Sequence, residues 1–363
     1  MTEHAPPRVS AVSVHVGDEE TAAVTRVLRS GRLVQGQEVA SFEAEFSAVV
    51  GDRTCVAVNS GTSALHLGLL AAGIGPGDEV VVPSFTFAAT ANAVAVTGAT
   101  PVFADIEPAT FCLDPDAVAA AVTSRTAAII PVHLYGHPAP WDGLADVAER
   151  HGLLLLEDAA QAHAASYDGT PVGALGDIAA FSFYATKNMT TGEGGMVVCR
   201  DEATARTVRL LRNQGMEQRY RNEIAGLNNR MTDLAAAMGR VQLRRLAGWN
   251  EERRAVAATY DEQLAGVVTT PVVAPKAEPV WHQYTVRSRD RDSLAARLDA
   301  RGIDSAVYYP VPTHRLPAYD LDLSLIETDR AAREVLSLPI RPGLTDEEVA
   351  RVVAAVNEES DHG

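Results

Sequence analysis

The chain has 363 residues, of which 47% are hydrophobic and 21% charged, a composition typical of a globular enzyme with a substantial core. Its formal net charge of -16 argues against general binding to nucleic acids or anionic membranes, because both need a basic surface. The three cysteines are scattered, without disulfide-framework or metal-ligand spacing, so no metal site is expected. The N-terminus has no apolar signal-peptide core, and no apolar run reaches the roughly 20 residues that span a bilayer. We therefore expect a cytoplasmic protein that does not enter membranes.

Along the chain, two helices are expected first, over residues 14–30 and 39–50. An alternation of apolar strands and helices follows. The expected strands are residues 55–58, 79–83, 100–104, 127–132, 153–157, 178–183 and 196–199. The helices between many of them are residues 63–72, 86–97, 115–122, 141–151 and 202–213. This alternation predicts a mostly parallel sheet covered by helices on both faces, with ligands at the carboxyl ends of its strands.

The last third of the chain has a different pattern. A long helix is expected over residues 232–264, with a bend at Gly248. The elements expected after it are a strand at 281–287, a helix at 292–301, a strand at 305–309, and helices at 328–336 and 346–356. The sequence thus predicts an α/β protein with a three-layer, mostly parallel large domain (residues 1–248) and a smaller C-terminal α+β domain (residues 249–363).

A turn with anion-binding character lies at residues 59–62 (NSGT), between an expected strand and an expected helix. Free N–H groups and the positive helix end favour an anion there, and Gly61 permits a close approach of the backbone. Thr62 adds a hydroxyl donor. The alternative is a simple helix cap, which Ser and Thr form in many proteins.

Asp158 ends an apolar run, residues 153–158 (LLLLED). A carboxylate at the end of a buried strand is desolvated and needs a partner. One such partner is the protonated ring nitrogen of pyridoxal phosphate (PLP), a cofactor that accepts electrons from the substrate carbon. The alternatives are an Asp that caps the next turn or pairs with an Arg.

Lys187 follows the next expected strand, in residues 181–195 (FSFYATKNMTTGEGG). A desolvated lysine exposes a nucleophilic amine, which can form a Schiff base with PLP and later act as a general base. Ser182, five positions earlier, is placed to reach the cofactor phosphate. A lone loop lysine is usually exposed to solvent, but Ser, Thr, Asn and three glycines crowd around this one. Together with Asp158 and Gly61, it favours a PLP enzyme.

These segments resemble the DegT/DnrJ/StrS family of PLP-dependent sugar aminotransferases, which have the type I aminotransferase fold. The resemblance extends over nearly the whole chain. It is carried by residues 30–36 (SGRLVQG), 59–62, 83–87 (PSFTF), 131–136 (PVHLYG), 157–161 (EDAAQ), the lysine loop, 226–231 (GLNNRM), and residues 309–310 through His314 to Tyr319.

The resemblance implies roles around the cofactor ring. Lys187 is similar to the Schiff-base lysine and Asp158 to the acid at the ring nitrogen. Gln161 matches the residue beside the ring hydroxyl. Phe87 matches the aromatic side chain that stacks on the ring, although it could equally belong to the core.

Other positions are implied at the phosphate and the substrate. Gly61, Thr62 and Ser182 match phosphate donors. Asn228 and Arg230 match residues that reach the phosphate from a neighbouring subunit, which implies a homodimer with shared sites, although Asn229 departs from the aromatic that is common there. The implied substrate residues are Tyr309 and His314. A satisfied surface histidine is the alternative for His314.

The resemblance implies amino transfer from Glu or Gln to a nucleotide-linked keto-deoxysugar in amino-sugar biosynthesis. A 4-keto-6-deoxyhexose is favoured, because Glu193 resembles members that act at C4, whereas members that act at C3 more often have Asp. The alternatives are a 3-keto sugar or a keto-cyclitol of an aminoglycoside pathway.

Two further functional hypotheses have less support from the sequence. A PLP-dependent sugar dehydratase is disfavoured, because that branch replaces the lysine with His. A non-catalytic sensor or regulator that keeps the fold is disfavoured by the joint presence of Asp158, Gln161, Ser182 and Lys187.

Overall fold

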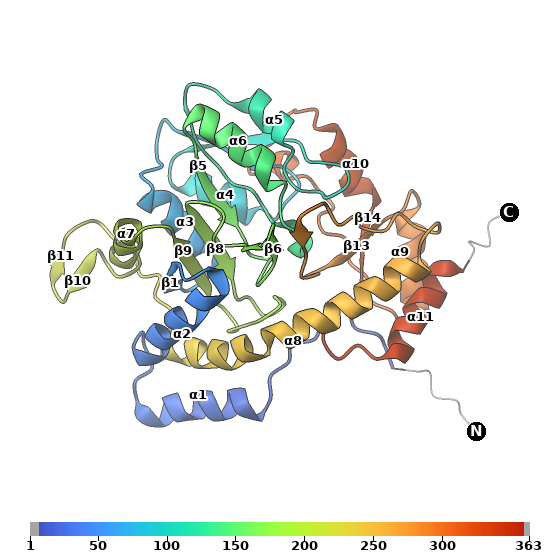
Figure 1. The fold of residues 1–363 in the computed structure, drawn as a ribbon, viewed down its shortest axis with the longest axis horizontal. Helices are drawn as coiled ribbons and strands as arrows, with labels where there is room; N and C mark the ends of the chain where they lie inside the picture. Colours follow the sequence, from blue (N-terminus) through green and yellow to red (C-terminus); the bar gives the residue numbers. More distant parts are fainter. Residues whose placement is uncertain (1–6, 359–363) are drawn as a thin grey trace.

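The computed structural model describes residues 7–358. A seven-stranded sheet lies at the centre of this part of the chain (Figure 1). The strand order is β1-β9-β8-β5-β4-β2-β3. β9 runs antiparallel to both of its neighbours, β1 and β8, and the remaining strand pairs of this described sheet are parallel. The predicted α/β class with a mostly parallel sheet is therefore confirmed. The strand bounds are β1 Thr54–Val58, β2 Glu79–Pro83, β3 Thr100–Ala104, β4 Thr126–Ile129, β5 Leu154–Asp158, β8 Ile178–Ser182 and β9 Gly195–Cys199.

Both faces of this sheet are buried, because successive side chains of a strand point to opposite sides. In β2, Val80 and Val82 lie in one apolar cluster and Val81 lies in another. The first cluster includes side chains from α3 (Gly61–Ala71), α4 (Ala89–Val96) and α7 (Glu202–Arg212). The opposite face is covered by α2 (Gln37–Ser47), α5 (Pro115–Ala121), α6 (Trp141–His151) and the first half of α8 (Asp233–Gln263). This arrangement gives the three layers that the sequence predicts.

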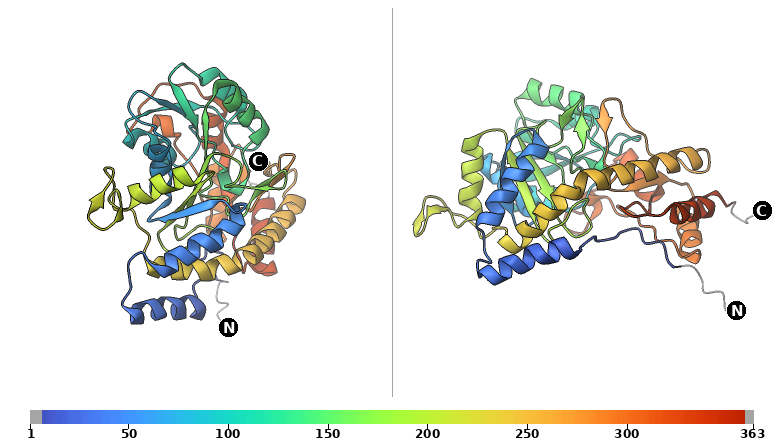
Figure 2. Two further views of the ribbon diagram at one scale, coloured as in Figure 1. Left: turned by 60° about the vertical axis from the view of Figure 1, so that its left-hand side comes forward. Right: turned by 60° about the horizontal axis from the view of Figure 1, so that its bottom comes forward.

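The long helix α8 connects the sheet region to a second apolar core (Figure 1). Ala236 near its start packs in the sheet region, and Tyr260 near its end packs in the second core. α8 is one helix through Gly248, so the structure shows no break at the expected bend. The second core also includes side chains from α9 (Arg291–Ala300), β13 (Tyr284–Arg287), β14 (Val335–Leu338) and α11 (Asp346–Asn357). Helix α1 (Asp18–Ser30) lies along α8, as both views of Figure 2 show.

Two predictions of secondary structure in the C-terminal third are wrong. Residues 305–309 form no strand and contribute a single bridge, between Ala306 and Ser337. The helix expected at 328–336 is α10 (Ile326–Glu334), and the chain then changes to strand β14, which pairs antiparallel with β13. A short apolar run such as VLSL is compatible with a buried helix end or a buried strand, so its periodicity cannot separate them.

Several short elements were not expected from the sequence. β6 (Ser166–Tyr167), β7 (Thr170–Pro171) and β12 (Ala277–Glu278) form a small sheet. β10 (Met216–Gln218) and β11 (Arg221–Asn222) form a hairpin that projects beyond α7 (Figure 1). The 3-10 turns are η1 (Ala48–Val50), η2 (Leu134–Gly136) and η3 (Thr313–Arg315). Strands of two or three residues are too short to leave a periodic signal.

The division into residues 1–248 and 249–363 stays a prediction. Its boundary falls inside the continuous helix α8. In addition, Val9 near the start of the described chain forms a parallel bridge with Ile303 and packs in the second core. Within residues 7–358, no helix is both long and apolar enough to cross a bilayer.

Candidate active site

A cavity of about 340 Å³ lies at the carboxyl ends of the central strands. Its lining includes most of the residues that the sequence singles out, although they are far apart along the chain. These are Gly61, Thr62, Phe87, Asp158, Gln161, Ser182, Lys187 and Tyr309. Asn228, Arg230 and His314 are not among its lining residues.

Asp158 reaches the cavity because it is the last residue of β5, in the middle of the sheet. One carboxylate oxygen, Oδ2, accepts a hydrogen bond from Thr90 Oγ1 at 2.7 Å, and Oδ1 accepts one from the Ala160 N–H at 3.2 Å. Burial raises the pKa of Asp158, against the lowering effect of the Thr90 hydrogen bond. Two neutral donors leave the buried carboxylate without a full counter-charge, so a cationic partner in the cavity is favourable. The Thr90 contact could not be predicted from the sequence, because it joins α4 to β5.

Glu157, the preceding residue, points to the other side of β5 and is fully buried. Its Oε2 accepts hydrogen bonds from the Gly173 N–H at 2.9 Å and from His133 Nε2 at 3.0 Å. Its Oε1 accepts from the N–H groups of Leu175 at 3.1 Å and Gly176 at 2.8 Å. Four donors satisfy this carboxylate within the protein, so Glu157 secures the segment after β7 and faces no ligand.

Lys187 lies in the loop between β8 and β9, and its backbone N–H donates to the Tyr184 carbonyl at 2.9 Å. Two backbone hydrogen bonds close the loop. The Thr191 N–H donates to the Phe183 carbonyl, and the Phe183 N–H donates to the Gly194 carbonyl. Burial lowers the pKa of Lys187 to about 8, although the Asp158 carboxylate opposes this shift. At this pKa roughly a tenth of the lysine is the neutral, nucleophilic amine at pH 7.

The start of α3 forms a cradle against the end of β8. The Ser60 side chain caps the helix by accepting from the Ser63 N–H at 3.1 Å, so the N–H groups of Gly61 and Thr62 stay free at the helix end. A Cβ at Gly61 would lie 2.6 Å from Ser182 Cβ, which is too close for any side chain. Glycine therefore lets the helix end, its positive dipole and the Ser182 hydroxyl meet at one place.

The cavity lining also includes Gln161, Tyr309 and Phe87. Gln161 Oε1 accepts from the Tyr135 N–H at 2.6 Å, and its Nε2 donates to the Tyr309 hydroxyl at 3.2 Å. The Phe87 ring is 61% exposed and its centroid lies 6.1 Å from that of Tyr309. A side chain so exposed is no part of the core, which removes the alternative that the sequence left open for Phe87.

Arg230 and Asn228 lie at the edge of this region. Arg230 lines an adjoining hollow of about 380 Å³, and Glu193 lines both that hollow and the main cavity. Arg230 Nη1 donates to Asn213 Oδ1 at 3.0 Å. Asn228 is exposed to solvent. Their expected contact with a neighbouring subunit's phosphate stays a prediction.

His314 is neither at the surface nor in the cavity. It is fully buried, and its Nδ1 lies 2.6 Å from Ser84 Oγ. Its ring packs against Phe103, with centroids 6.3 Å apart. The surface alternative is therefore wrong, while its role toward the substrate stays a prediction.

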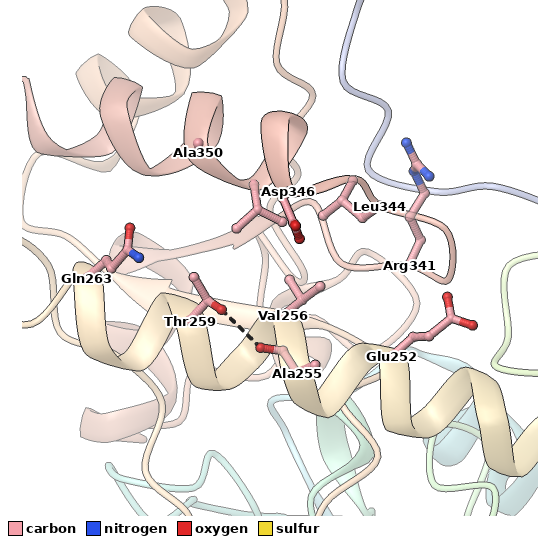
Figure 3. Close-up of a pocket in the computed structure, with 10 residues that line it drawn as sticks. Glu252, Ala255, Val256, Thr259, Gln263, Arg341, Leu344, Asp346 and Ala350 are labelled. Atoms are coloured by element: carbon pink, nitrogen blue, oxygen red, sulfur yellow. Dashed lines mark hydrogen bonds between the residues drawn. The ribbon is translucent and has the colours of Figure 1, made fainter.

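Another hollow, of about 430 Å³, lies between α8 and the start of α11 (Figure 3). Two of its charged side chains, Arg341 and Glu252, already have partners among the described residues. Arg341 Nη2 donates to Glu348 Oε1 at 2.8 Å, and Glu252 Oε2 accepts from the Gly343 N–H at 2.7 Å. None of the predicted site residues lines it, so the chemistry belongs to the cavity at the sheet.

A model of the DegT/DnrJ/EryC1/StrS aminotransferase family matches residues 14–357. The chain belongs to this family. One relative, dTDP-3-amino-3,4,6-trideoxy-alpha-D-glucose transaminase of Streptomyces venezuelae, is 48% identical over 97% of this chain and 96% of that protein. Another, UDP-N-acetyl-3-dehydro-alpha-D-glucosamine 3-aminotransferase of Acidithiobacillus ferrooxidans, is 41% identical over 93% of each protein. The crystal structure of S. venezuelae DesV in complex with a ketimine intermediate has a TM-score of 0.94 and 48% identity, covering 97% of this chain and 98% of that one.

Membership of the DegT/DnrJ/EryC1/StrS family makes the protein a PLP-dependent aminotransferase, as the sequence predicts. The cavity fits this cofactor. Lys187 supplies the amine, and the free side of Asp158 suits a ring N–H. The cradle of Gly61 and Ser182 has the free N–H groups and the hydroxyl that a phosphate needs.

Proposed function

We propose that this aminotransferase transfers an amino group from Glu or Gln to a nucleotide-linked keto-deoxyhexose in amino-sugar biosynthesis. The observation that carries the chemistry is the convergence of Lys187, Asp158 and the Gly61 cradle on one cavity. The sugar class is supported by the S. venezuelae relative, whose name describes a dTDP-linked amino sugar and whose identity of 48% extends over nearly the full length of both chains.

In this proposal each residue has a defined task. PLP, when bound, supplies an electron sink for the substrate carbon that carries the nitrogen. Lys187 Nζ binds the cofactor covalently, and once released it accepts and returns the proton at the substrate carbon. Asp158 keeps the ring nitrogen protonated, because a buried carboxylate gains most by holding a proton donor against it. Gly61, Thr62 and Ser182 hold the phosphate, and Gln161 and Phe87 orient the ring.

Amination at C3 is the first candidate. Both relatives described above are named for a 3-amino or 3-dehydro sugar. Amination at C4 is the second candidate, and the observation that favours it is Glu193, which lines the cavity where members acting at C3 more often have Asp. The two reactions need the same cofactor residues, so the difference lies in how the sugar is oriented above them.

The site is proposed to be completed by a second copy of the chain. Asn228 is exposed and Arg230 lies in the adjoining hollow, where the family places residues that cross to a neighbouring phosphate. A cytoplasmic location is proposed as well, because the three free, buried cysteines fit a reducing compartment. Sedimentation analysis of the purified protein tests the dimer, and a monomer that turns over at full rate contradicts shared sites.

The substrate is tested by incubation of the PLP-loaded protein with a panel of nucleotide-linked 3-keto and 4-keto deoxyhexoses and keto-cyclitols. Glutamate and glutamine serve as donors in parallel, and mass spectrometry with NMR locates the new amine. We expect an aminated deoxyhexose, with the C3 substrates ahead of the C4 substrates. Product from the cyclitols alone, or no product from any keto-sugar, contradicts the proposal.

A further inference from the structure

The Asp158 carboxylate is held by two donors that come from different elements. Thr90 Oγ1, in the first turn of α4, donates to Oδ2 at 2.7 Å, and the Ala160 N–H, in the turn after β5, donates to Oδ1 at 3.2 Å. Thr90 is buried, with 1% of the residue exposed, and it lines the same cavity as Asp158. The helix and the turn together therefore fix the orientation of the carboxylate at the cavity.

The direction of these contacts follows from the groups involved. An ionised carboxylate has no proton to give, so the single hydroxyl proton of Thr90 is committed to Asp158. Thr86 Oγ1 lies 3.3 Å from Thr90 Oγ1. Because the Thr90 proton is already used, Thr86 is the donor in this second contact. The two hydroxyls thus form a chain that ends on the carboxylate, and such chains strengthen their own hydrogen bonds by polarisation.

The C-terminal part of the protein anchors this hydroxyl chain. Thr313 Oγ1, in η3, donates to the Thr86 carbonyl at 3.0 Å, and the Thr313 backbone N–H donates to the Ser84 carbonyl at 2.9 Å. Thr86 and Thr313 are both buried. Threonine side chains are stiff because they branch at Cβ, so the positions of the hydroxyls are set by the fold itself.

The hydroxyl chain opposes the effect of burial on Asp158. Burial raises the pKa of Asp158, and the hydrogen bond from Thr90 is the largest influence that lowers it. The charges of Lys187 and His133 lower this pKa by smaller amounts. A hydroxyl that donates to Oδ2 favours the ionised form, because a proton on Oδ2 would compete with it. Among the described residues, the other titratable side chains that line the cavity are Tyr184, Glu193, His282, Tyr308 and Tyr309.

We propose that Thr90 keeps Asp158 ionised and oriented for the protonated ring nitrogen of PLP, and that Thr86 supports it by donating to Thr90. Both act through Asp158 and are therefore positioning residues. This inference rests on the proposed role of Asp158 toward the cofactor. One proton lies between the buried carboxylate and the ring nitrogen. The more strongly the protein stabilises the carboxylate as an ion, the more fully this proton stays on the ring, where it strengthens the electron sink.

Four variants test the hydroxyl chain. Thr90→Val removes the hydroxyl with little change in shape, and Thr90→Ser keeps a hydroxyl as the conservative variant. Thr86→Val removes the second donor. Thr97→Val is the matched control, because Thr97 is a buried threonine at the other end of α4 whose hydroxyl donates to the Val94 carbonyl at 2.8 Å. Thermal unfolding of each variant establishes that it is folded before any further measurement.

The main readout is the ionisation of Asp158 in full-length protein freed of PLP, so it does not depend on turnover. The aspartate carboxyl carbons are labelled with ¹³C and followed by NMR across a pH series, and the resonance that Asp158→Asn removes is that of Asp158. In Thr90→Val the midpoint should rise by about one pH unit, because a hydrogen bond to a charged group is lost. Thr86→Val should raise it by less. Thr90→Ser and Thr97→Val should leave it near that of the unchanged protein.

A purely structural bond would give a different result. If Thr90 only holds α4 against β5, Thr90→Val and Thr97→Val should both lose stability and neither should move the midpoint. An unshifted midpoint in Thr90→Val, or an equal shift in Thr97→Val, overturns the proposal.

The kinetics of the PLP-loaded protein give an independent check. The kcat of Thr90→Val should fall about tenfold, the equivalent of one pH unit, with little change in KM, because Thr90 acts on Asp158. A raised KM with an unchanged kcat would place Thr90 at the substrate and contradict the proposal.

If Thr90→Val does not fold, the unchanged protein and Thr86→Val provide the test. An ionised Asp158 at pH 7 in the PLP-free protein, with a higher midpoint in Thr86→Val, supports the proposal. A protonated Asp158 at pH 7, or a midpoint that Thr86→Val does not move, overturns it. Borohydride reduction keeps this test distinct from that of the enzyme itself. If PLP is fixed to Lys187 in every variant while the midpoints coincide, the Thr90 inference fails and the proposed function stands.

Discussion

Glu157 and Asp158 are neighbours at the end of β5, and their side chains point to opposite faces of the sheet. Glu157 is fully buried and accepts four hydrogen bonds from groups of the protein itself. Asp158 is also buried but accepts two, and it borders the cavity with Lys187. The same residue class, one position apart, therefore serves two purposes.

The difference lies in how completely each buried charge is satisfied. A carboxylate with four donors is a structural link, and removing it leaves several donors without partners. A carboxylate with two neutral donors has a raised pKa and favours a cationic partner, which the cavity can admit. Stability should depend mainly on Glu157, and catalysis mainly on Asp158. The predictions below test this division.

The largest effect is expected for Asp158→Asn. The kcat should fall by about 10²- to 10³-fold, because a neutral amide cannot stabilise a protonated ring nitrogen. The free energy of unfolding of the cofactor-free protein should not fall, since a buried charge without a full partner has been removed. Steady-state kinetics and urea unfolding measure the two quantities. A loss of stability with full activity would reverse the assignment.

Glu157→Gln should show the opposite pattern. Its amide N–H₂ would face backbone donors, so we expect a loss of about 3 kcal/mol in the free energy of unfolding. The kcat of the folded fraction should change much less than in Asp158→Asn. Measuring both variants in the same buffer makes each the control of the other. Equal losses of stability in the two would remove the distinction.

The cradle offers a smaller test on the cavity side. In Gly61→Ala the new Cβ would lie 2.6 Å from Ser182 Cβ, which forces α3 away from β8. Overpacking of this kind costs about 1–3 kcal/mol, and PLP should bind more weakly. Gly248→Ala is the control, because nothing lies within 4 Å of its added Cβ in α8. That variant should be more stable by about 1 kcal/mol and bind PLP normally.

The smallest effect is a pH dependence of stability that comes from Asp158. Its folded-state pKa is raised, so the folded protein binds this proton more tightly than the unfolded chain does. Asp158 therefore adds stability that is complete below the ordinary Asp pKa of about 3.9 and is lost as the pH rises through the raised value. In the cofactor-free protein, the stability of the unchanged chain relative to Asp158→Asn should fall as pH rises from acid to neutral. A constant difference across that range contradicts a desolvated Asp158.

Much of the fold could be predicted because the sheet is buried on both faces. Its strands are apolar runs between helical segments, and this pattern is local in sequence. Asp158 and Lys187 were predictable for the same reason, since each polar residue follows such a run at the carboxyl edge. β14 was missed because a run of four residues, three of them apolar, has no distinctive period.

Contacts between distant segments left no signal in the sequence. The bond from Thr90 to Asp158 joins positions 68 residues apart, and the bond between His133 and Glu157 crosses from one loop to a strand. The burial of His314 depends on Ser84, 230 residues away. Such contacts can be identified only in the folded structure, where the distant segments lie together.

The central claim is that Lys187 holds PLP opposite Asp158, and one measurement tests it most directly. The purified protein, saturated with PLP, is reduced with borohydride and digested, and the modified peptide is identified by mass spectrometry. Because the chain has two lysines, the result is a choice between Lys187 and the surface residue Lys276. The account predicts the reduced cofactor on Lys187 and none on Lys276, with Lys276→Arg unchanged. A label on Lys276, or no covalent label at all, would contradict it.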